Sequence, residues 1–241
     1  MGEEHYSRTA KLFLVLTLII MPFDVRLQTS FNCLISGSSG TGKTTLVKNL
    51  LRLRAQLFTE DPEKIFLFYN NDQPIYDEML REGLIDQKID ANVDFPTIDY
   101  LTTLVAPFKR GRGSMLIFDD IMADITEDFT KIICNMSHHE KSSVIFLTQN
   151  LFFKHKVFRT LSLNMHYMFL MTNERDKQQI SNLGRQVCPN NPNFLVDVYS
   201  AAAARAYEYL LLDFRVNQNK QVRLRSNIFP HQFPMRVYNE T

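Results

Sequence analysis

Residues Gly37-Ser38-Ser39-Gly40-Thr41-Gly42-Lys43-Thr44 form a complete phosphate-binding loop, the P-loop or Walker A pattern. The apolar run before it, residues 31–36, is typical of a buried strand, and the residues after it continue as a helix. Three of the eight glycines of the chain stand in this loop, where a backbone that aims its N–H groups at a phosphate must turn tightly. The combination of strand, loop and helix predicts a site for a nucleoside triphosphate.

Each position of the loop has a predicted role. Lys43 supplies a positive charge for the β- and γ-phosphates, and Thr44 supplies a hydroxyl for Mg²⁺. The helix that starts here adds its positive N-terminal end. The predicted nucleotide contacts are Gly37, Ser38, Ser39, Gly40, Thr41, Gly42, Lys43, Thr44 and Thr45.

Length and composition indicate the class of protein. A chain of 241 residues with 45% apolar content can bury a full core and favours one large α/β domain. The net charge of +1 does not indicate a polyanionic partner, so contact with nucleic acid would require a local basic patch. The three cysteines are too few and too scattered for a zinc site or a disulfide framework, and they fit a reduced, intracellular protein.

Apolar runs of strand length alternate with helical patterns along the chain. This alternation predicts a mainly parallel sheet that is flanked by helices on both faces. The tail differs, because residues 207–214 and 223–229 predict an antiparallel hairpin around a polar turn at 217–220. The expected strands are 31–37, 64–70, 114–120, 142–149 and 166–172, and the expected helices are 43–55, 74–82, 124–136, 157–163 and 175–187.

The N-terminal segment contains an unbroken apolar run at residues 12–21. The run is about half the length that spans a bilayer. Glu3 and Glu4 precede it, and no small-residue cleavage site of a signal peptide follows it. We therefore expect no membrane segment, and we interpret the run as a buried strand or a strand that contacts another subunit. The expected organisation is an N-terminal extension at 1–21 and a P-loop ATPase domain at 22–241.

A second half of the nucleotide site follows at residues 115–120, where four apolar residues end in two carboxylates, as in a Walker B strand. Asp119 is the predicted partner of Thr44 at Mg²⁺. Asp120 occupies the place of the acid that orients and deprotonates the attacking water, a role in which Glu is usual. Such a run alone is a weak signal, but its combination with the P-loop predicts an ATPase.

The next expected strand ends in Thr148, Gln149 and Asn150. Gln149 is the candidate sensor of the γ-phosphate or of the lytic water, and the alternative is an ordinary polar residue at a strand end. A GTPase is disfavoured because the nearest match to its guanine-binding motif, at 173–176, has Glu174 in place of lysine. A small-molecule kinase remains an alternative, although the double carboxylate and the amide favour ATP hydrolysis coupled to work.

These motifs, with several later ones, resemble the genome-packaging ATPases of double-stranded DNA viruses and of virus-like Polinton elements. Those proteins belong to the FtsK/HerA-like superfamily of DNA pumps. The resemblance covers residues 22–232, and the motifs after the Walker B strand are more specific than the P-loop. The segments that carry it are 34–44, 117–120, 137–139, 144–151, 159–164, 175–177, 209–210 and 223–230.

The resemblance implies a homo-oligomeric ring, a pentamer or hexamer, that threads double-stranded DNA into a preformed capsid. The implied partners are DNA, contacted at its phosphates without sequence preference, and a capsid or portal protein. The implied location is the virion or the interior of the host cell, in cytoplasm or nucleus, and not a secreted state. A DNA translocase or helicase of replication or plasmid transfer is the alternative function.

The resemblance also implies that an arginine of one subunit completes the site of the next. Arg159 is the first candidate and Arg175 the second, and surface ion pairs are the alternative for either. The basic, glycine-containing turn at 109–113 is the candidate for DNA contact in the pore. We expect His138 and His139 in a turn or loop before the strand at 142–149, with no metal between them.

Overall fold

The computed structural model describes residues 24–93, 95–121, 126–151, 161, 163–173 and 177–240. The expected N-terminal extension at 1–21 lies outside these residues. Arg159 and Arg175 also lie outside them, as does most of the helix expected at 157–163.

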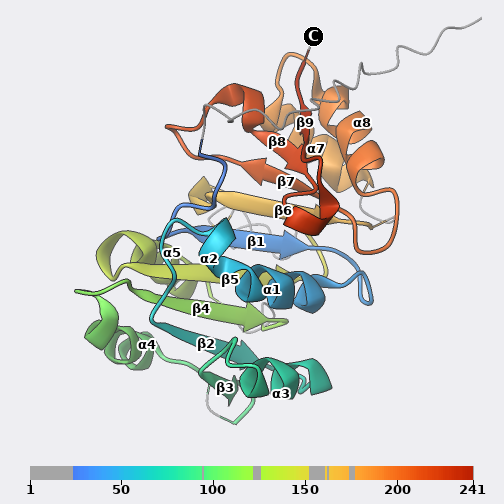
Figure 1. The fold of residues 1–241 in the computed structure, drawn as a ribbon. Helices are drawn as coiled ribbons and strands as arrows, with labels where there is room; N and C mark the ends of the chain where they lie inside the picture. Colours follow the sequence, from blue (N-terminus) through green and yellow to red (C-terminus); the bar gives the residue numbers. More distant parts are fainter. Residues whose placement is uncertain are drawn as a thin grey trace, which may run out of the picture.

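One nine-stranded sheet runs through the described part of the chain, in the order β3-β2-β4-β5-β1-β6-β7-β8-β9 (Figure 1). The strands from β3 to β6 are parallel, and β7, β8 and β9 extend the sheet with antiparallel pairs. The strands are β1 (Asn32–Ser36), β2 (Lys64–Tyr69), β3 (Gln87–Asp90), β4 (Ser114–Asp119), β5 (Ser142–Thr148), β6 (Tyr167–Met171), β7 (Tyr209–Asp213), β8 (Leu224–Ser226) and β9 (Arg236–Tyr238).

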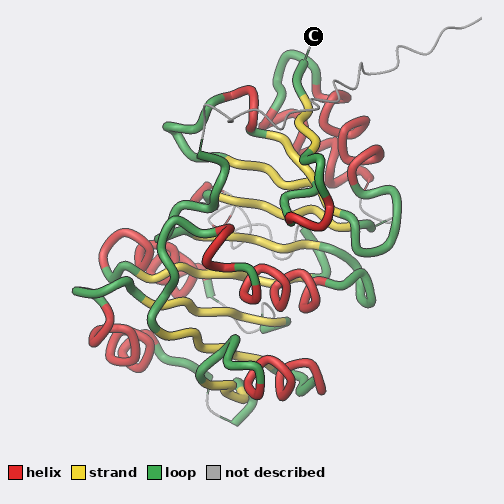
Figure 2. Tube along the Cα trace, in the orientation of Figure 1, coloured by secondary structure: helices red, strands yellow, loops and turns green. Residues whose placement is uncertain are grey.

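Helices cover both faces of this sheet (Figure 2). The α-helices are α1 (Lys43–Arg52), α2 (Arg54–Leu57), α3 (Pro74–Arg81), α4 (Ile98–Val105), α5 (Glu127–His139), α7 (Lys177–Val187) and α8 (Pro192–Ala202). Short 3-10 helices are η1 (Ala106–Phe108), η3 (Lys220–Val222) and η4 (Pro230–Gln232).

The alternation of side chains along the strands divides the core into two layers. In β1, Leu34 faces the layer that α4, α5, α7 and α8 cover. Cys33 and Ile35 face the opposite layer, under α1, α2 and α3. Because a parallel sheet is buried on both faces, its strands read as continuous apolar runs in the sequence. The predicted α/β fold is therefore confirmed, including its mainly parallel sheet.

The C-terminal hairpin is confirmed as the antiparallel pair of β7 and β8, in which Leu211 lies opposite Arg225. The expected helix at 43–55 ends at Arg52, and α2 follows as a separate turn. The strands β3 and β9 and the helix α4 were not predicted, and no bounds were predicted for α8. β3 and β9 are short edge strands with polar residues, which carry little apolar periodicity.

The expectation that His138 and His139 lie in a loop was wrong, because both belong to the last turn of α5. The helix begins after the cap residue Thr126 and ends at His139, a few residues later than the sequence suggested, with Glu140 as its C-cap residue. Histidines near a helix C-terminus are favourable, since the carbonyl end of the helix attracts positive charge. The ring of His138 packs edge to face on that of His166, with 5.7 Å between the ring centres.

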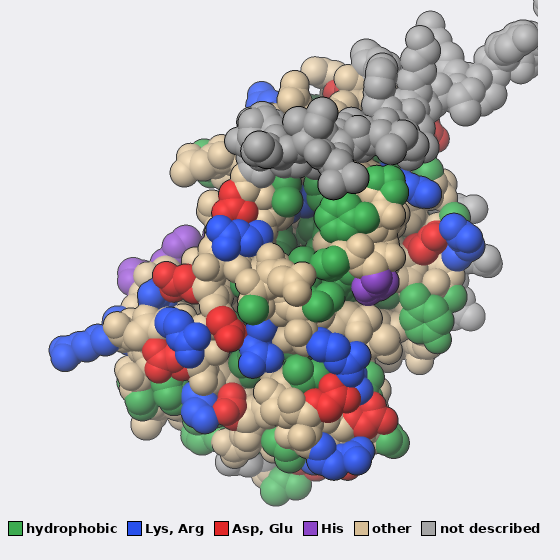
Figure 3. Space-filling view, in the orientation of Figure 1, with side chains coloured by type: hydrophobic (Ala, Val, Ile, Leu, Met, Phe, Trp, Pro, Cys, Tyr) green, Lys and Arg blue, Asp and Glu red, His purple; other side chains and the backbone are tan. Residues whose placement is uncertain are grey.

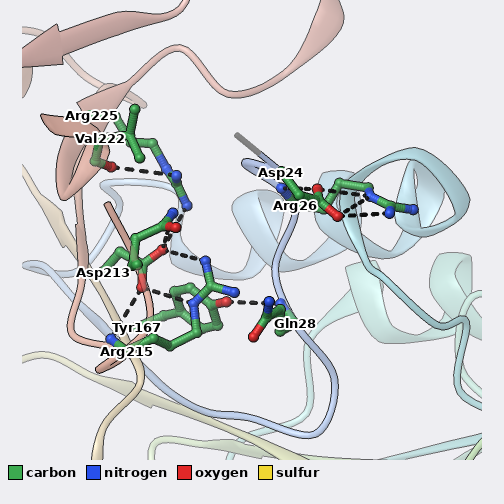
Figure 4. Close-up of polar contacts among 9 residues, drawn as sticks. Asp24, Arg26, Gln28, Tyr167, Asp213, Arg215, Val222 and Arg225 are labelled. Carbon is green, nitrogen blue, oxygen red and sulfur yellow. Dashed lines mark hydrogen bonds and ion pairs between the residues drawn. The ribbon is translucent and has the colours of Figure 1, made fainter. Parts of the chain in front are cut away.

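A buried charge cluster fixes the C-terminal hairpin to the sheet (Figure 4). The carboxylate of Asp213 accepts hydrogen bonds from Arg215, at 2.9 and 2.7 Å, and from Arg225, at 3.1 Å. The Arg215 guanidinium also lies 5.0 Å from the centre of the Tyr167 ring, at the start of β6. The cluster therefore joins three neighbouring strands, β6, β7 and β8.

On the face that Figure 3 shows, basic and acidic side chains are interspersed, as the net charge of +1 suggests. Many charged side chains of the described residues pair, for example Lys48 of α1 with Glu78 of α3 and with Glu82. No helix in the described part of the chain is both long and apolar enough to span a membrane.

Candidate nucleotide site

The strand order brings the two predicted halves of the site together. β1, which leads into the P-loop, lies beside β5, and β5 lies beside β4, which carries the Walker B carboxylates. Because these strands are parallel, their carboxyl ends meet at one edge of the sheet. A cavity of about 390 Å³ opens there, and it is lined by Ser39, Gly40, Gly42, Lys43, Thr44, Thr45, Gln73, Pro74, Ile75, Asp119, Asp120, Gln149 and Tyr207.

The loop reaches α1 through two glycines in the left-handed backbone region, Gly40 with φ 80° and Gly42 with φ 93°. Gly42 is the N-cap residue of α1, and no side chain caps the helix. The first N–H groups of a helix have no partner within the helix. At this uncapped end they are suited to bind an anion, and Lys43, Thr44 and Thr45 form the first turn.

Lys43 lies across the loop. Its Nζ donates hydrogen bonds to the carbonyl oxygens of Gly37, at 2.8 Å, and Ser38, at 3.1 Å. Burial lowers the pKa of the Lys43 ammonium, and the nearby carboxylates of Asp119 and Asp120 oppose this shift. The ammonium is thus held between the loop and the acidic end of the cavity.

Asp119 is the last residue of β4 and is buried. Its Oδ2 accepts hydrogen bonds from the Thr44 hydroxyl, at 3.0 Å, and from the Tyr76 hydroxyl, at 2.8 Å. Burial raises the pKa of Asp119, and both hydrogen bonds act in the opposite direction by stabilising the ionised form. Burial likewise raises the pKa of Tyr76, so its hydroxyl keeps the proton that it donates.

Asp120 and Gln149 lie together at the same edge of the sheet. The Gln149 amide Nε2 donates to Asp120 Oδ2 at 3.0 Å, between the ends of β4 and β5. Asp120 has a left-handed backbone with φ 58°, which is unusual for a residue other than glycine. Such backbone outliers cluster at functional sites. The structure therefore places the expected water-activating acid and the expected sensor in contact.

The oxygen ligands at this edge fit Mg²⁺. The Thr44 hydroxyl and the Asp119 carboxylate meet at the cavity wall. The hydrogen bonds from Thr44 and Tyr76 both go to Oδ2 of Asp119, which leaves Oδ1 to bind a metal ion. Mg²⁺ usually keeps several waters and binds through one or two protein oxygens together with phosphates. A cluster of three or more His, Cys, Asp or Glu side chains, as a dedicated metal cage would need, is absent from the described residues.

Tyr76 was missed by the sequence analysis. It belongs to α3, 43 residues before Asp119, and its hydroxyl also accepts a hydrogen bond from Gln73 Nε2 at 2.9 Å. Gln73 in turn lines the cavity. A tyrosine in a helix is ordinarily a packing residue, so no local sequence pattern indicates this contact.

The basic turn at 109–113 lies away from this cavity. It directly precedes β4, whereas the P-loop follows β1, so the two loops lie at opposite edges of a parallel sheet. Lys109 pairs with Glu140 at 3.2 Å, and the Arg112 guanidinium lies 4.0 Å from Asp61. All three cationic residues of the turn, Lys109, Arg110 and Arg112, are exposed.

Replacing Tyr76 by Phe is expected to increase the Mg²⁺ concentration that half-saturates ATP turnover. The substitution removes one of the two hydrogen bonds that orient and ionise Asp119, and it keeps the ring in the core. The pKa of Asp119 should then rise further, so activity should be lost at a higher pH than in the wild type as the pH falls. A Mg²⁺ titration at several pH values measures both effects.

The matched control is Tyr69→Phe. The centre of the Tyr69 ring lies 5.3 Å from that of Tyr76, but within the described part of the chain the Tyr69 hydroxyl donates no hydrogen bond to Asp119. Tyr69→Phe should leave the dependence of ATP turnover on Mg²⁺ concentration and on pH unchanged. If Tyr76→Phe also leaves them unchanged, Tyr76 is only a packing residue.

Solved structures with similar folds share little sequence with this chain. The genome packaging NTPase B204 of Sulfolobus turreted icosahedral virus 2, solved in complex with ATPγS, has 11% identity over 87% of this chain and 97% of B204, with a TM-score of 0.49. The cytoplasmic domain of the Type VII secretion ATPase EccC of Thermomonospora curvata has 13% identity over 86% of this chain, with a TM-score of 0.50. This chain corresponds to 25% of the EccC chain, and the likeness supports the fold alone.

No curated protein matches the chain significantly. The family model of the Poxvirus A32 protein matches residues 23–187, a stretch that contains the P-loop, both Walker B carboxylates and Gln149. This match confirms the resemblance drawn from the motifs and the predicted ATPase activity. The chain belongs to the Poxvirus A32 protein family, a family of viral packaging ATPases.

Proposed function

We propose that the cavity at the carboxyl ends of β1, β4 and β5 binds ATP and hydrolyses it. The observation that carries this proposal is the meeting of two polar pairs at one edge of the sheet, Thr44 with Asp119 and Asp120 with Gln149. The first pair suits a metal-bound triphosphate, and the second suits an attacking water.

In this proposal the backbone N–H groups of the loop and the Lys43 ammonium bind the phosphates. Thr44 and Asp119 would hold Mg²⁺, which would supply positive charge to offset the charge that develops on the phosphate oxygens. Asp120 accepts the proton of the attacking water, and Gln149 orients both the carboxylate and that water. A small-molecule kinase would need neither of the last two roles.

We further propose that hydrolysis drives double-stranded DNA into a preformed viral capsid. Membership of the Poxvirus A32 protein family supports packaging over a role in replication or plasmid transfer. The working assembly is a ring of identical subunits, a pentamer or hexamer, that contacts a capsid or portal protein. Such a motor acts at the virion or inside the host cell.

The composition of the cavity supports a ring in which neighbouring subunits share a site. Lys43 is the one cation among the described residues that line the cavity, and no arginine lines it. Phosphoryl transfer by this class of enzyme commonly uses an arginine to stabilise the transition state. Arg159 is our first candidate for an arginine supplied by the neighbouring subunit, and Arg175 is the second.

Phosphate contacts to DNA are assigned in this proposal to the basic turn at 109–113. Its position at the sheet edge opposite the cavity keeps DNA away from the nucleotide. Arg110 is the cation best suited to reach a phosphate, because Lys109 and Arg112 lie near Glu140 and Asp61. A ring multiplies a small number of such contacts, which reconciles DNA binding with a net charge of +1.

Duplex DNA is expected to stimulate ATP turnover without sequence preference, and the stimulation should fall steeply as salt rises. Binding to DNA phosphates releases condensed counterions, which produces this salt dependence. Replacing Lys109, Arg110 and Arg112 together by Ala should weaken the stimulation and leave turnover without DNA intact. Phosphate release measured against salt, with duplexes of different sequence, tests these expectations.

Lys131→Ala is the matched control, because Lys131 is an exposed cation on α5 that pairs with Glu127 and Asp128. It should not change the stimulation. Stimulation that depends on base sequence, or that is absent at every salt concentration, would count against a DNA-packaging motor. Loss of turnover without DNA in the triple variant would instead assign the turn to folding or to the ATP site.

A further inference from the structure

Tyr207 lies at the rim of the cavity, in the segment between α8 and β7. The residue is 61% exposed, which is high for a large aromatic residue. The ring nevertheless packs directly on the P-loop, since a Cβ atom on Gly42 would lie only 2.3 Å from its Cδ1 atom. Gly42 is thus the residue that makes room for the ring, and one aromatic surface remains open beside the loop.

The sheet order sets the direction in which a bound nucleotide extends. Asp119 and Asp120 end β4 and Gln149 follows β5, so the polar groups for the γ-phosphate lie on one side of β1. Tyr207 lies two residues before the start of β7, which is on the other side of β1, beyond β6. With its γ-phosphate at the carboxylates, a nucleotide must extend its base away from them, and Tyr207 lines the cavity on that other side.

Local contacts hold this segment in place before any ligand binds. The Thr172 hydroxyl at the end of β6 donates to the Arg205 carbonyl at 2.9 Å. The Arg205 backbone N–H and side chain both donate to the Glu208 carboxylate, at 3.0 and 3.1 Å. Tyr207, between them, has a left-handed backbone with φ 67°, a conformation that bulky residues rarely adopt. Strain of this kind persists where a site needs a preorganised side chain.

We propose that Tyr207 is the surface on which the base of the bound nucleotide stacks. An aromatic ring stacks on the π-face of any base and does not read its hydrogen-bonding groups. The ligand class is therefore nucleoside triphosphates, and the ring itself does not distinguish ATP from GTP. This inference rests on the ATP site proposed above and adds a subsite to it.

Replacing Tyr207 by Ala is expected to raise the KM for ATP about tenfold and to leave kcat nearly unchanged, because stacking contributes equally to ground state and transition state. Tyr207→Phe should restore the wild-type KM, since the ring is kept. Inorganic tripolyphosphate with Mg²⁺ lacks a base, so its inhibition of ATP turnover should be equal in the wild type and in Tyr207→Ala.

A direct readout comes from Tyr207→Trp, because the chain contains no other tryptophan. Addition of ATP should quench the indole fluorescence, and addition of tripolyphosphate should not. Equal weakening of ATP and tripolyphosphate binding by Tyr207→Ala would overturn the proposal. So would an unchanged KM together with a changed oligomer mass in sedimentation, which would make Tyr207 a subunit contact. Failure of the whole ATP site is distinguishable, since Lys43→Ala would then leave turnover intact.

Discussion

Replacing Lys43 by Ala is expected to abolish ATP turnover and to weaken ATP binding strongly, whereas Asp120→Asn should bind ATP normally and fail to hydrolyse it. The Lys43 ammonium lies at the loop that holds the phosphates, so its charge acts as soon as the nucleotide binds. Asp120 acts only when water is activated, and loss of such a general base costs roughly 100-fold or more in rate.

Calorimetric titration with ATP and an assay of released phosphate measure the two effects separately. Asn retains the shape of Asp and can still bond to Gln149, so Asp120→Asn should fold normally. Normal turnover in this variant would refute the assignment of the water-activating acid. The assignment of the P-loop would be refuted if Lys43→Ala still bound ATP with wild-type affinity.

The second large effect is expected at the buried charge cluster. Asp213→Asn should lower the free energy of unfolding by about 3–5 kcal/mol, because it removes the carboxylate that neutralises both Arg215 and Arg225. Asp213 and Arg225 are fully buried, and Arg225 Nε has no hydrogen-bond partner among the described residues. The two guanidiniums would then face each other with no buried carboxylate between them.

The chain contains its own control for this effect in Asp24, which forms a similar two-bond contact with Arg26 two residues later (Figure 4). The side chains of Arg26 and Asp24 are 45% and 44% exposed. Asp24→Asn should therefore cost less than about 1 kcal/mol. Urea unfolding of both variants measures the difference. Equal losses for the two variants would show that burial of the Asp213 cluster contributes no special stability.

The local motifs were predictable because their chemistry is contained in a few consecutive residues. The P-loop requires glycines, a lysine and a threonine in fixed order, and the Walker B strand requires an apolar run before Asp119. The place of Gln149 beside the Walker B carboxylates was also predictable, since the carboxyl ends of neighbouring parallel strands meet. Its role as a sensor stays a prediction. The structure adds that Gln149 contacts Asp120 directly, which spacing does not reveal.

Tyr76 and Tyr207 were not predictable, because their contacts depend on how distant elements pack. Tyr76 reaches Asp119 only because α3 packs on the same face of the sheet as α1. Tyr207 reaches Gly42 only because β7 extends the sheet beyond β6. A missed signal did exist for α4, where Thr97 accepts a hydrogen bond from the Tyr100 N–H as a typical N-cap.

Displacement of a third DNA strand from a duplex is the most direct test of a motor that moves along DNA. With ATP, the wild-type protein should displace the third strand, and the delay before displacement should increase with the distance between that strand and the end where the protein loads. Asp120→Asn should bind the duplex without displacing the third strand. DNA-stimulated ATP hydrolysis with no displacement on any duplex would contradict a translocating motor.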